Sequence, residues 1–392
     1  LLPENFMNSS KKLIYIANLR LPTEKAYGIQ IAKMCEAFAD LGVDVNLVFP
    51  YRRSPFIREN IYSYYSIKNN FTTKKIWAPD FYFVGKLDEI SFYIKSLISA
   101  VFLSFYALFK DVDLFYSRDE FPLFLLSFFR KNLIYEAHRF SRSRRLFYKR
   151  FQHRNLKVVV ITKRLKEDLM KIGFKQENIL VAPDGVDLEG FDIDMSKEVA
   201  RDRIGLPLGK KIVMYAGHLF EWKGADTLLQ VAKTYNLQPT TYNLLFVFVG
   251  GTEYDAEKFR QKARDMDLKN VLILGHKPHK DIPFFLKAAD VLVLPNSAKE
   301  EISKSYTSPL KMFEYMASKR PVVASDLSSI REVLNETSSF LVKPDNPNAL
   351  AEGINKVLDD FELAKNISNK AFGDVQEHTW LKRAESIINF SK

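Results

Sequence analysis

The sequence predicts an α/β protein built of two doubly wound, Rossmann-like domains, each with a parallel sheet covered by helices. Two observations carry this prediction. Short runs rich in Val, Ile and Leu alternate with helical stretches along nearly the whole chain, a pattern typical of parallel strands buried on both faces. The chain also has 392 residues, which is more than one hydrophobic core usually fills.

Six apolar runs in each half are expected to form strands. They are residues 13–17, 43–49, 113–117, 133–137, 158–162 and 179–183 in the first half, and 211–217, 244–250, 271–275, 291–295, 321–325 and 339–342 in the second. The alternation of strand-like and helical stretches is interrupted once, over residues 184–209. This segment is rich in acidic, Gly and Pro residues and contains no strand-like run. We therefore place the interdomain linker there.

This gives a first domain at 1–190, a second domain at 191–372 and a C-terminal helix at 373–392. We expect this last helix to pack on another part of the chain, and the first domain is the candidate surface. We expect the two domains to face a central cleft, because open sheets of this kind bind ligands beyond the carboxyl ends of their strands.

The net charge of +11 favours an anionic partner, such as a nucleotide, a nucleic acid or an acidic membrane surface. Cys35 is the sole cysteine, which excludes an intrachain disulfide and fits a reducing compartment. It lies in an apolar helical pattern, so we expect its thiol to be buried. We expect a cytoplasmic protein, with peripheral attachment to the inner face of the cytoplasmic membrane as an open alternative. The Arg-rich segment 139–154 could meet such a surface or be a solvated helix face.

The longest apolar run covers residues 90–109, but it contains Lys95. Its uncharged part, residues 96–109, is only 14 residues long, whereas a helix that spans a bilayer needs about 20. A buried or partly interfacial helix is therefore favoured over a membrane span.

The first candidate site follows the strand at 211–217. Gly217 allows a tight turn, and Lys223 stands just before a helix expected to begin at Ala225. A cation at a helix N-terminus opposes the helix dipole but suits a bound phosphate, so Lys223 is a candidate phosphate ligand, with a solvated surface lysine as the alternative. The spacing of a Walker A loop is absent.

A second helix start follows the strand at 291–295. Ser308 is predicted to cap this helix, with Pro309 at its first position and an end near Ser318. The free amides of Leu310 and Lys311, with the charge of Lys311, would make a second anion site at the same sheet edge. Two anion sites on one edge suit a diphosphate.

Glu314 lies on or beside the apolar stripe of that helix. Burying an unpaired carboxylate is costly, so Glu314 should have a partner, either a protein donor or a ligand such as a ribose diol. In the first half, Gly28 opens a helix at the cleft edge and His138 follows the strand at 133–137. A lone histidine is often structural, so catalytic and structural roles for His138 both stay open.

Four segments, in this order along the chain, resemble the family 4 retaining glycosyltransferases of the GT-B fold. They are AYGIQIAKMCEAFADLG (26–42), the first helix; PDGVDLEGF (183–191), the segment that leads into the linker; YAGHLFEWKG (215–224), the phosphate loop; and ADVLVLPNS (289–297) with SPLKMFEYMASKRPVVASDLSSIREVL (308–334), the donor-binding segment.

The resemblance implies roles for individual residues. Lys223 would hold the diphosphate of a nucleotide sugar, with UDP the expected nucleotide, and Glu314 would bind the ribose hydroxyls. Gly28 would let the backbone approach the phosphate, and His138 would lie beside the donor sugar. The implied catalytic residues are thus His138 and Lys223. The implied donor-binding residues are Gly28, Gly217, His218, Lys223, Tyr306, Ser308, Leu310, Lys311 and Glu314.

The chain departs from the family pattern at two positions. His218 stands where the family usually has Arg, and Tyr306 stands where it has the first Glu of Glu-x7-Glu. The Tyr-x-Ser-Pro-x-Lys variant resembles a subgroup of the family. Glu300 or Glu301 is the candidate to take over the missing contact with the sugar.

The implied activity is retaining, metal-independent transfer of a hexosyl group to a carbohydrate or lipid-linked acceptor in glycan, polysaccharide or glycolipid synthesis. Neither a metal nor a cofactor is expected. The alternatives are a nucleotide-sugar epimerase of the same fold and a non-catalytic nucleotide-sugar-binding protein. Nucleic acid is not an expected partner, because no nucleic-acid-binding motif is found.

Overall fold

The computed structural model describes residues 10–53, 59–81, 88–237 and 243–392 and divides into two compact units. The first unit is formed by Leu1–Ala182 and Trp380–Lys392, and the second by Pro183–Thr379. These borders fall eight residues before and seven residues after the borders at 190 and 372 that the sequence suggested. The first change of unit immediately precedes the predicted linker at 184–209.

The first unit contains a parallel sheet of seven strands in the order β3-β2-β1-β4-β5-β6-β7. The strands are β1 (Lys12–Ile16), β2 (Asp44–Pro50), β3 (Thr72–Ile76), β4 (Leu114–Ser117), β5 (Leu133–Ala137), β6 (Lys157–Val160) and β7 (Ile179–Val181). All six strands predicted in this half are confirmed. The sequence missed β3, because this edge strand reads TTKKI and its side chains are mostly exposed.

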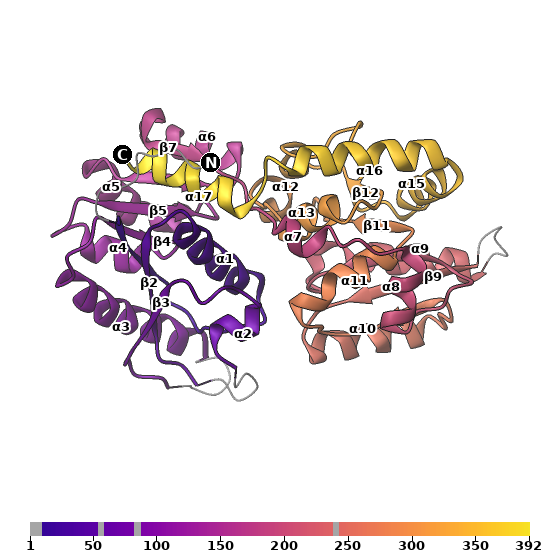
Figure 1. Cartoon of the computed structure of the whole chain (residues 1–392), viewed down its shortest axis with the longest axis horizontal. Coiled ribbons are helices and arrows are strands. Elements are labelled where there is room, and N and C mark those ends of the chain that lie inside the picture. Colours follow the sequence, from indigo (N-terminus) through magenta and orange to yellow (C-terminus); the bar gives the residue numbers. More distant parts are fainter. Residues whose placement is uncertain (1–9, 54–58, 82–87, 238–242) are drawn as a thin grey trace. The chain divides into compact units, whose positions relative to one another are not determined.

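Helices flank this sheet (Figure 1). They are α1 (Ala26–Asp40), α2 (Ile61–Tyr65), α3 (Asp88–Leu108), α4 (Glu120–Leu126), α5 (Arg145–His153), α6 (Lys163–Lys171) and α17 (Trp380–Ser391), with 3-10 turns η2 (Arg142–Arg144) and η3 (Gln176–Asn178). Cys35 on α1 is a fully buried free thiol, as predicted.

The C-terminal helix α17 packs on α1 and completes the first unit (Figure 1). Lys157 Nζ donates to the carbonyl oxygen of Phe390 (2.7 Å), and Lys11 Nζ donates to Ser391 Oγ (2.7 Å). Arg383, on the same helix, is only 3% exposed on its side chain and reaches the end of β5. Helix α17 corresponds to the last part of the C-terminal helix expected at 373–392, whereas residues 373–379 belong to the second unit.

The second unit has a parallel sheet of six strands in the order β10-β9-β8-β11-β12-β13. The strands are β8 (Lys211–Ala216), β9 (Leu244–Val249), β10 (Val271–Ile273), β11 (Val291–Leu294), β12 (Val322–Ser325) and β13 (Phe340–Val342). All six were predicted. Alternate residues of β8 enter two different hydrophobic clusters, so both faces of the sheet are covered.

The covering elements of the second unit are mostly short helices. They are α7 (Leu188–Phe191), α8 (Lys197–Ile204), α9 (Ala225–Leu237), α10 (Glu253–Asp265), α11 (Ile282–Ala288), α12 (Glu301–Ser305), α13 (Leu310–Ala317), α14 (Ser328–Arg331), α15 (Pro347–Asp359) and α16 (Phe361–Val375), with 3-10 turns η4 (Glu221–Lys223) and η5 (His279–Asp281).

The strand order reverses once in each sheet, between β1 and β4 in the first unit and between β8 and β11 in the second. In open α/β sheets ligands bind outside the carboxyl ends of the strands at such a reversal. The segments that follow β8 and β11, including helix α13, contain most of the site residues that the sequence singled out.

Candidate functional site

The loop after β8 is shaped by two glycines. Gly217 has a φ of +146° and Gly224 a φ of +71°, values that favour glycine. A Cβ on Gly224 would lie 1.7 Å from the carbonyl oxygen of Pro295, so the loop closes tightly against the end of β11. The tight turn at Gly217 and the start of α9 at Ala225 are confirmed. Lys223 ends η4, immediately before this closure.

Lys311 in the first turn of α13 is 5% exposed. Among the described residues, its Nζ has no hydrogen-bond partner, and it lies 4.1 Å from the centre of the Tyr215 ring. Its Cδ is 3.4 Å from the position of a Cβ on Gly217, so the glycine loop and the lysine are in contact. A buried ammonium group with no hydrogen-bond acceptor is costly, and an anionic ligand would remove that cost.

Two positive charges share this corner of the second unit. Burial and the neighbouring charge of Lys223 lower the pKa of Lys311 well below its usual value, against the attraction of Glu314. Burial lowers the pKa of Lys223 to about 8, also against Glu314. The two lysines outnumber the one carboxylate, and a bound diphosphate would favour the charged form of both amines.

Glu314 is paired within the protein. Its Oε1 lies 2.8 Å from Nε2 of His279, a residue of η5, and its side chain is 13% exposed. Of the two partners that the sequence left open, the structure supplies the protein side chain. The pairing with His279 leaves room for a ribose, because a carboxylate has two oxygens and accepts several hydrogen bonds. The ribose role of Glu314 stays a prediction.

The prediction that Ser308 caps α13 is wrong. Pro309 is the N-cap residue, and the helix begins at Leu310 and ends at Ala317. The Ser308 hydroxyl instead accepts a hydrogen bond from the backbone amide of Asp184 (2.9 Å) within the same unit. Proline's fixed φ suits a position at the entrance of a helix, and the serine before it is turned toward another segment. The amides of Leu310 and Lys311 do lie in the first turn, where no intrahelical acceptor exists.

The two departures from the family pattern lie beside these loops. The ring of His218 stacks on that of Phe220 (centroids 5.0 Å apart, planes at 5°), and its carbonyl oxygen accepts from the Tyr215 hydroxyl (2.5 Å). Tyr306 is half-buried at the C-terminal end of α12, whereas Glu300 and Glu301 are exposed at the other end of this helix. Their contacts with a sugar stay predictions.

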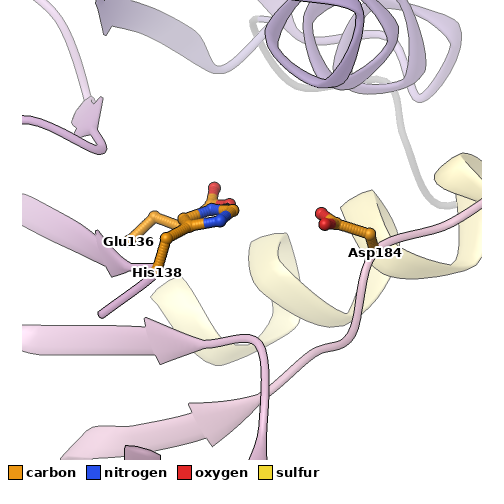
Figure 2. Close-up of side chains that lie close together, drawn as sticks. All are labelled: Glu136, His138 and Asp184. Carbon is orange, nitrogen blue, oxygen red and sulfur yellow. The ribbon is translucent and has the colours of Figure 1, made fainter. Parts of the chain in front are cut away.

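In the first unit, His138 and Glu136 lie together at the end of β5, and Figure 2 shows their two side chains side by side. Asp184, also drawn there, belongs to the second unit. His138 Nε2 lies 2.5 Å from Glu136 Oε1. Arg383 (2.9 Å) and Gln30 (2.8 Å) donate to the same oxygen.

The charges of this pair follow from their surroundings. Burial alone would raise the pKa of the fully buried Glu136, but Arg383, His138 and Arg118 together hold it well below its usual value. Burial, helped by Arg118, lowers the pKa of His138 to about 4. Because Glu136 is ionised and His138 is neutral near pH 7, we assign the imidazole proton to Nε2. Nδ1 then carries the lone pair and can accept a hydrogen bond.

Gly28 lies in the first turn of α1. The packing of the protein itself requires a glycine at this position, whether or not a ligand binds there. A Cβ there would lie 2.0 Å from the Tyr65 hydroxyl oxygen. That hydroxyl donates to the carbonyl oxygen of Thr23 and accepts from its amide, both at 2.8 Å. The contact of Gly28 with a phosphate stays a prediction.

Sequence reasoning missed Glu136, Arg383 and His279. Glu136 is a carboxylate inside a strand predicted to be fully buried, which is a readable signal that it has a charged partner. Arg383 is a buried arginine on an amphipathic helix, and nothing local links it to a residue about 250 positions away. His279 lies in a 3-10 turn that follows no pattern in the sequence.

The fold is that of a GT-B glycosyltransferase. The family model "Glycosyl transferases group 1" matches residues 196–374, and the model "Glycosyltransferase Family 4" matches residues 28–189. The two matches lie one in each half and together cover most of the chain. The chain therefore belongs to the family 4 glycosyltransferases.

Two curated relatives illustrate the likeness in sequence. UDP-Gal:alpha-D-GlcNAc-diphosphoundecaprenol alpha-1,3-galactosyltransferase of Escherichia coli is 31% identical over 220 residues, which are 54% of this chain and 52% of that protein. D-inositol 3-phosphate glycosyltransferase of Corynebacterium aurimucosum is 25% identical over 220 residues, 54% of this chain and 51% of that protein. The chain thus spans about half the length of these relatives.

Two solved structures show the likeness in fold. Anabaena Alr3699/HepE in complex with UDP and glucose has a TM-score of 0.74 at 18% identity, and the match covers 97% of this chain and 98% of that one. A mutant of TarM from S. aureus, solved with fondaparinux, alpha-GlcNAc-glycerol and UDP, has a TM-score of 0.72 at 14% identity, with 97% of this chain and 100% of that one covered. At these identities the likeness concerns the fold alone.

Proposed function

We propose that this glycosyltransferase moves a hexosyl group from a UDP-sugar to a hydroxyl group of a carbohydrate or lipid-linked acceptor, with retention of configuration and without a metal. The observation that carries the proposal is Lys311, a buried ammonium group without a hydrogen-bond acceptor among the described residues, next to Lys223. The UDP bound to Alr3699/HepE and the UDP-Gal and diphosphoundecaprenol named for the E. coli relative support the choice of donor and acceptor.

In this reaction the bond between the anomeric carbon and the diphosphate oxygen breaks, and the acceptor hydroxyl bonds to the same face of that carbon. The acceptor's proton passes to the departing phosphate oxygen. Lys223 and Lys311 stabilise the charge that grows on the diphosphate, which is the step where preorganised positive charge lowers the barrier. Glu136 is poorly suited to act as a nucleophile, because Arg383 and Gln30 already hold its carboxylate.

The test is a reaction with UDP-sugars, with and without an acceptor mixture and with and without EDTA. Transfer is expected only with acceptor, with at most slow hydrolysis in its absence, unchanged by EDTA, and with the donor's anomeric configuration in the product by NMR. Conversion of the donor without acceptor would identify an epimerase. Binding without any turnover would identify a sensor. We also propose a cytoplasmic location, which the buried thiol of Cys35 fits.

UDP affinity is expected to fall as the pH rises through about 8, because the Lys223 ammonium group, whose pKa is about 8, must be charged to pair with the diphosphate. Above that pH the loss should approach about tenfold per pH unit. In the Lys223→Arg variant the part of the fall that comes from Lys223 should disappear, since arginine stays charged. Calorimetry from about pH 6 to about pH 10 measures both, and identical profiles for the two proteins would contradict the assignment.

The Glu314→Gln variant should weaken UDP binding by about 1–3 kcal/mol, because a neutral amide replaces the charged acceptor of the ribose hydroxyls. Its melting temperature without ligand should change little, since glutamine still offers His279 a carbonyl oxygen. The matched control is His279→Ala, which removes the protein partner of Glu314 and should lower apo stability instead. A lower apo melting temperature of Glu314→Gln with unchanged UDP affinity would show that Glu314 serves only His279.

A further inference from the structure

Helix α3 of the first unit buries several polar residues and exposes a large apolar surface. Its buried stripe contains the polar residues Ser91, Lys95, Ser99 and Ser104 beside the apolar Ala100, Leu103 and Ala107. Its exposed stripe is apolar and largely aromatic. It consists of Ile90, Phe92, Tyr93, Ile94, Leu97, Val101, Phe102 and Phe105, followed by Phe109 just after the helix. Contiguous exposed apolar surface of this kind marks an interaction site.

The polar stripe fixes α3 to its own unit. Lys95 Nζ lies 3.5 Å from Asp80 Oδ1, and the Ser99 hydroxyl donates to Asn18 and accepts from Arg52. By length and composition the stretch Ile90–Leu108 could cross a membrane, yet 39% of it is buried inside the protein. Withdrawal of the helix into a bilayer would break the Lys95 pair and expose its charge to lipid, which is costly. The helix is therefore built to lie on a surface.

The apolar surface continues beyond α3. Trp77, 66% exposed after β3, packs edge-on against Phe102 (centroids 5.6 Å apart). Phe128 and Phe129, both exposed after α4, are joined to the end of α3 through Arg130, which donates to the carbonyl oxygen of Leu108 (2.5 Å). We call these three side chains and the exposed stripe of α3 the aromatic face. Figure 1 shows α3, α4 and α5 following one another on one side of the sheet.

Positive charge borders the aromatic face. Between residues 90 and 154 the exposed basic residues are Lys110, Lys131, Arg139, Arg142, Arg145 and Lys149, whereas the exposed acidic residues are Asp111 and Asp113. Lys74 and Lys75 are exposed close to Trp77. The basic segment that the sequence singled out thus belongs to the same helical layer, since α5 packs against α4. Aromatic side chains with Lys and Arg around them are typical of the bilayer interface.

We propose that the aromatic face docks the first unit on an anionic lipid bilayer, with α3 lying in the plane of the headgroups. Anionic headgroups complement the basic border, whereas a second copy of the chain would bring the same positive border against itself in a two-fold interface. The proposal does not depend on the donor site, because none of its residues belongs to the second unit.

The test is sedimentation of the full chain with vesicles of equimolar phosphatidylglycerol and phosphatidylcholine, and with vesicles of phosphatidylcholine alone. Binding is expected to the anionic vesicles and to weaken with salt. The double variant Phe105→Ser/Phe109→Ser should lose at least about tenfold in partition coefficient, since two large apolar side chains no longer enter the interface. The control Leu208→Ser/Phe361→Ser removes two comparably exposed apolar side chains of the second unit and should bind as the wild type does.

Trp77 reports depth in the bilayer. Brominated lipids should quench the fluorescence of the wild type, and the quenching should disappear in Trp77→Phe, which keeps Trp222 and Trp380. The proposal is overturned if the wild type does not bind anionic vesicles, if the double variant and its control bind equally, or if quenching survives in Trp77→Phe. It is also overturned if the wild type self-associates through Phe105 and Phe109 without binding vesicles, because the occupant would then be a second copy.

Discussion

The Lys311→Met variant is expected to lose about 2–4 kcal/mol of UDP affinity, the scale of a charge-assisted phosphate contact in a buried site. Without ligand the same variant should be more stable than the wild type by about 1–3 kcal/mol, because methionine fills the lysine's volume without a buried polar group that lacks an acceptor. These opposite signs distinguish a ligand-binding lysine from a structural one. Calorimetry measures the first effect, and denaturant unfolding of the apo proteins measures the second.

The stability difference should shrink as the pH rises. The pKa of Lys311 is lower in the folded protein than in the unfolded chain, so the wild type bears the full cost of its buried charge at low pH. As the pH increases above the folded pKa, the folded lysine sheds its proton and the wild type gains stability relative to Lys311→Met. The control Lys343→Met changes an exposed lysine of the same unit and should alter neither quantity. A less stable apo variant that binds UDP normally would contradict the phosphate role.

Burial decided which strands could be predicted from the sequence. The twelve strands that were predicted have side chains that are mostly buried or half-buried, and they stand in the sequence as continuous apolar runs. β3 pairs with β2 alone, at the edge, and its sequence TTKKI carries no apolar pattern, so a search for apolar runs could not find it. The same reasoning gave the starts of α9 and α13 to within a residue, because each follows a buried strand by a loop with Gly or Pro.

The hydrogen-bond partners of the site residues were harder to predict from the sequence, because they come from distant parts of the chain. Glu314 was predicted to need a partner, but the choice of His279, 35 residues earlier, depends on how η5 packs beside α13. Ser308 had the sequence of a cap, yet it bonds to Asp184, which is 124 residues away. Local patterns indicate which side chains must be satisfied, and only the tertiary structure determines which group satisfies them.

His138→Ala is expected to lower turnover about a hundredfold, the scale on which loss of one positioned hydrogen-bonding group lowers kcat. UDP affinity should change by less than about threefold, because the family resemblance assigns His138 to the sugar and not to the nucleotide. The activity should show no step between about pH 6 and about pH 7, where an ordinary histidine titrates, since the pKa of His138 is about 4 and the imidazole is already neutral there. Turnover with saturating UDP-sugar and calorimetry with UDP give the comparison.

Two further variants separate the two nitrogens of His138. In His138→Gln the side-chain amide can take the place of Nε2 and donate to Glu136, but nothing replaces the lone pair of Nδ1. In His138→Asn the carbonyl oxygen can take the place of Nδ1, and the contact with Glu136 is lost. If Nδ1 accepts a hydrogen bond from the sugar, Asn should retain more turnover than Gln, while Gln should retain more stability. If Gln restores both turnover and stability and Asn restores neither, His138 only holds Glu136, and its placement beside the donor sugar is wrong.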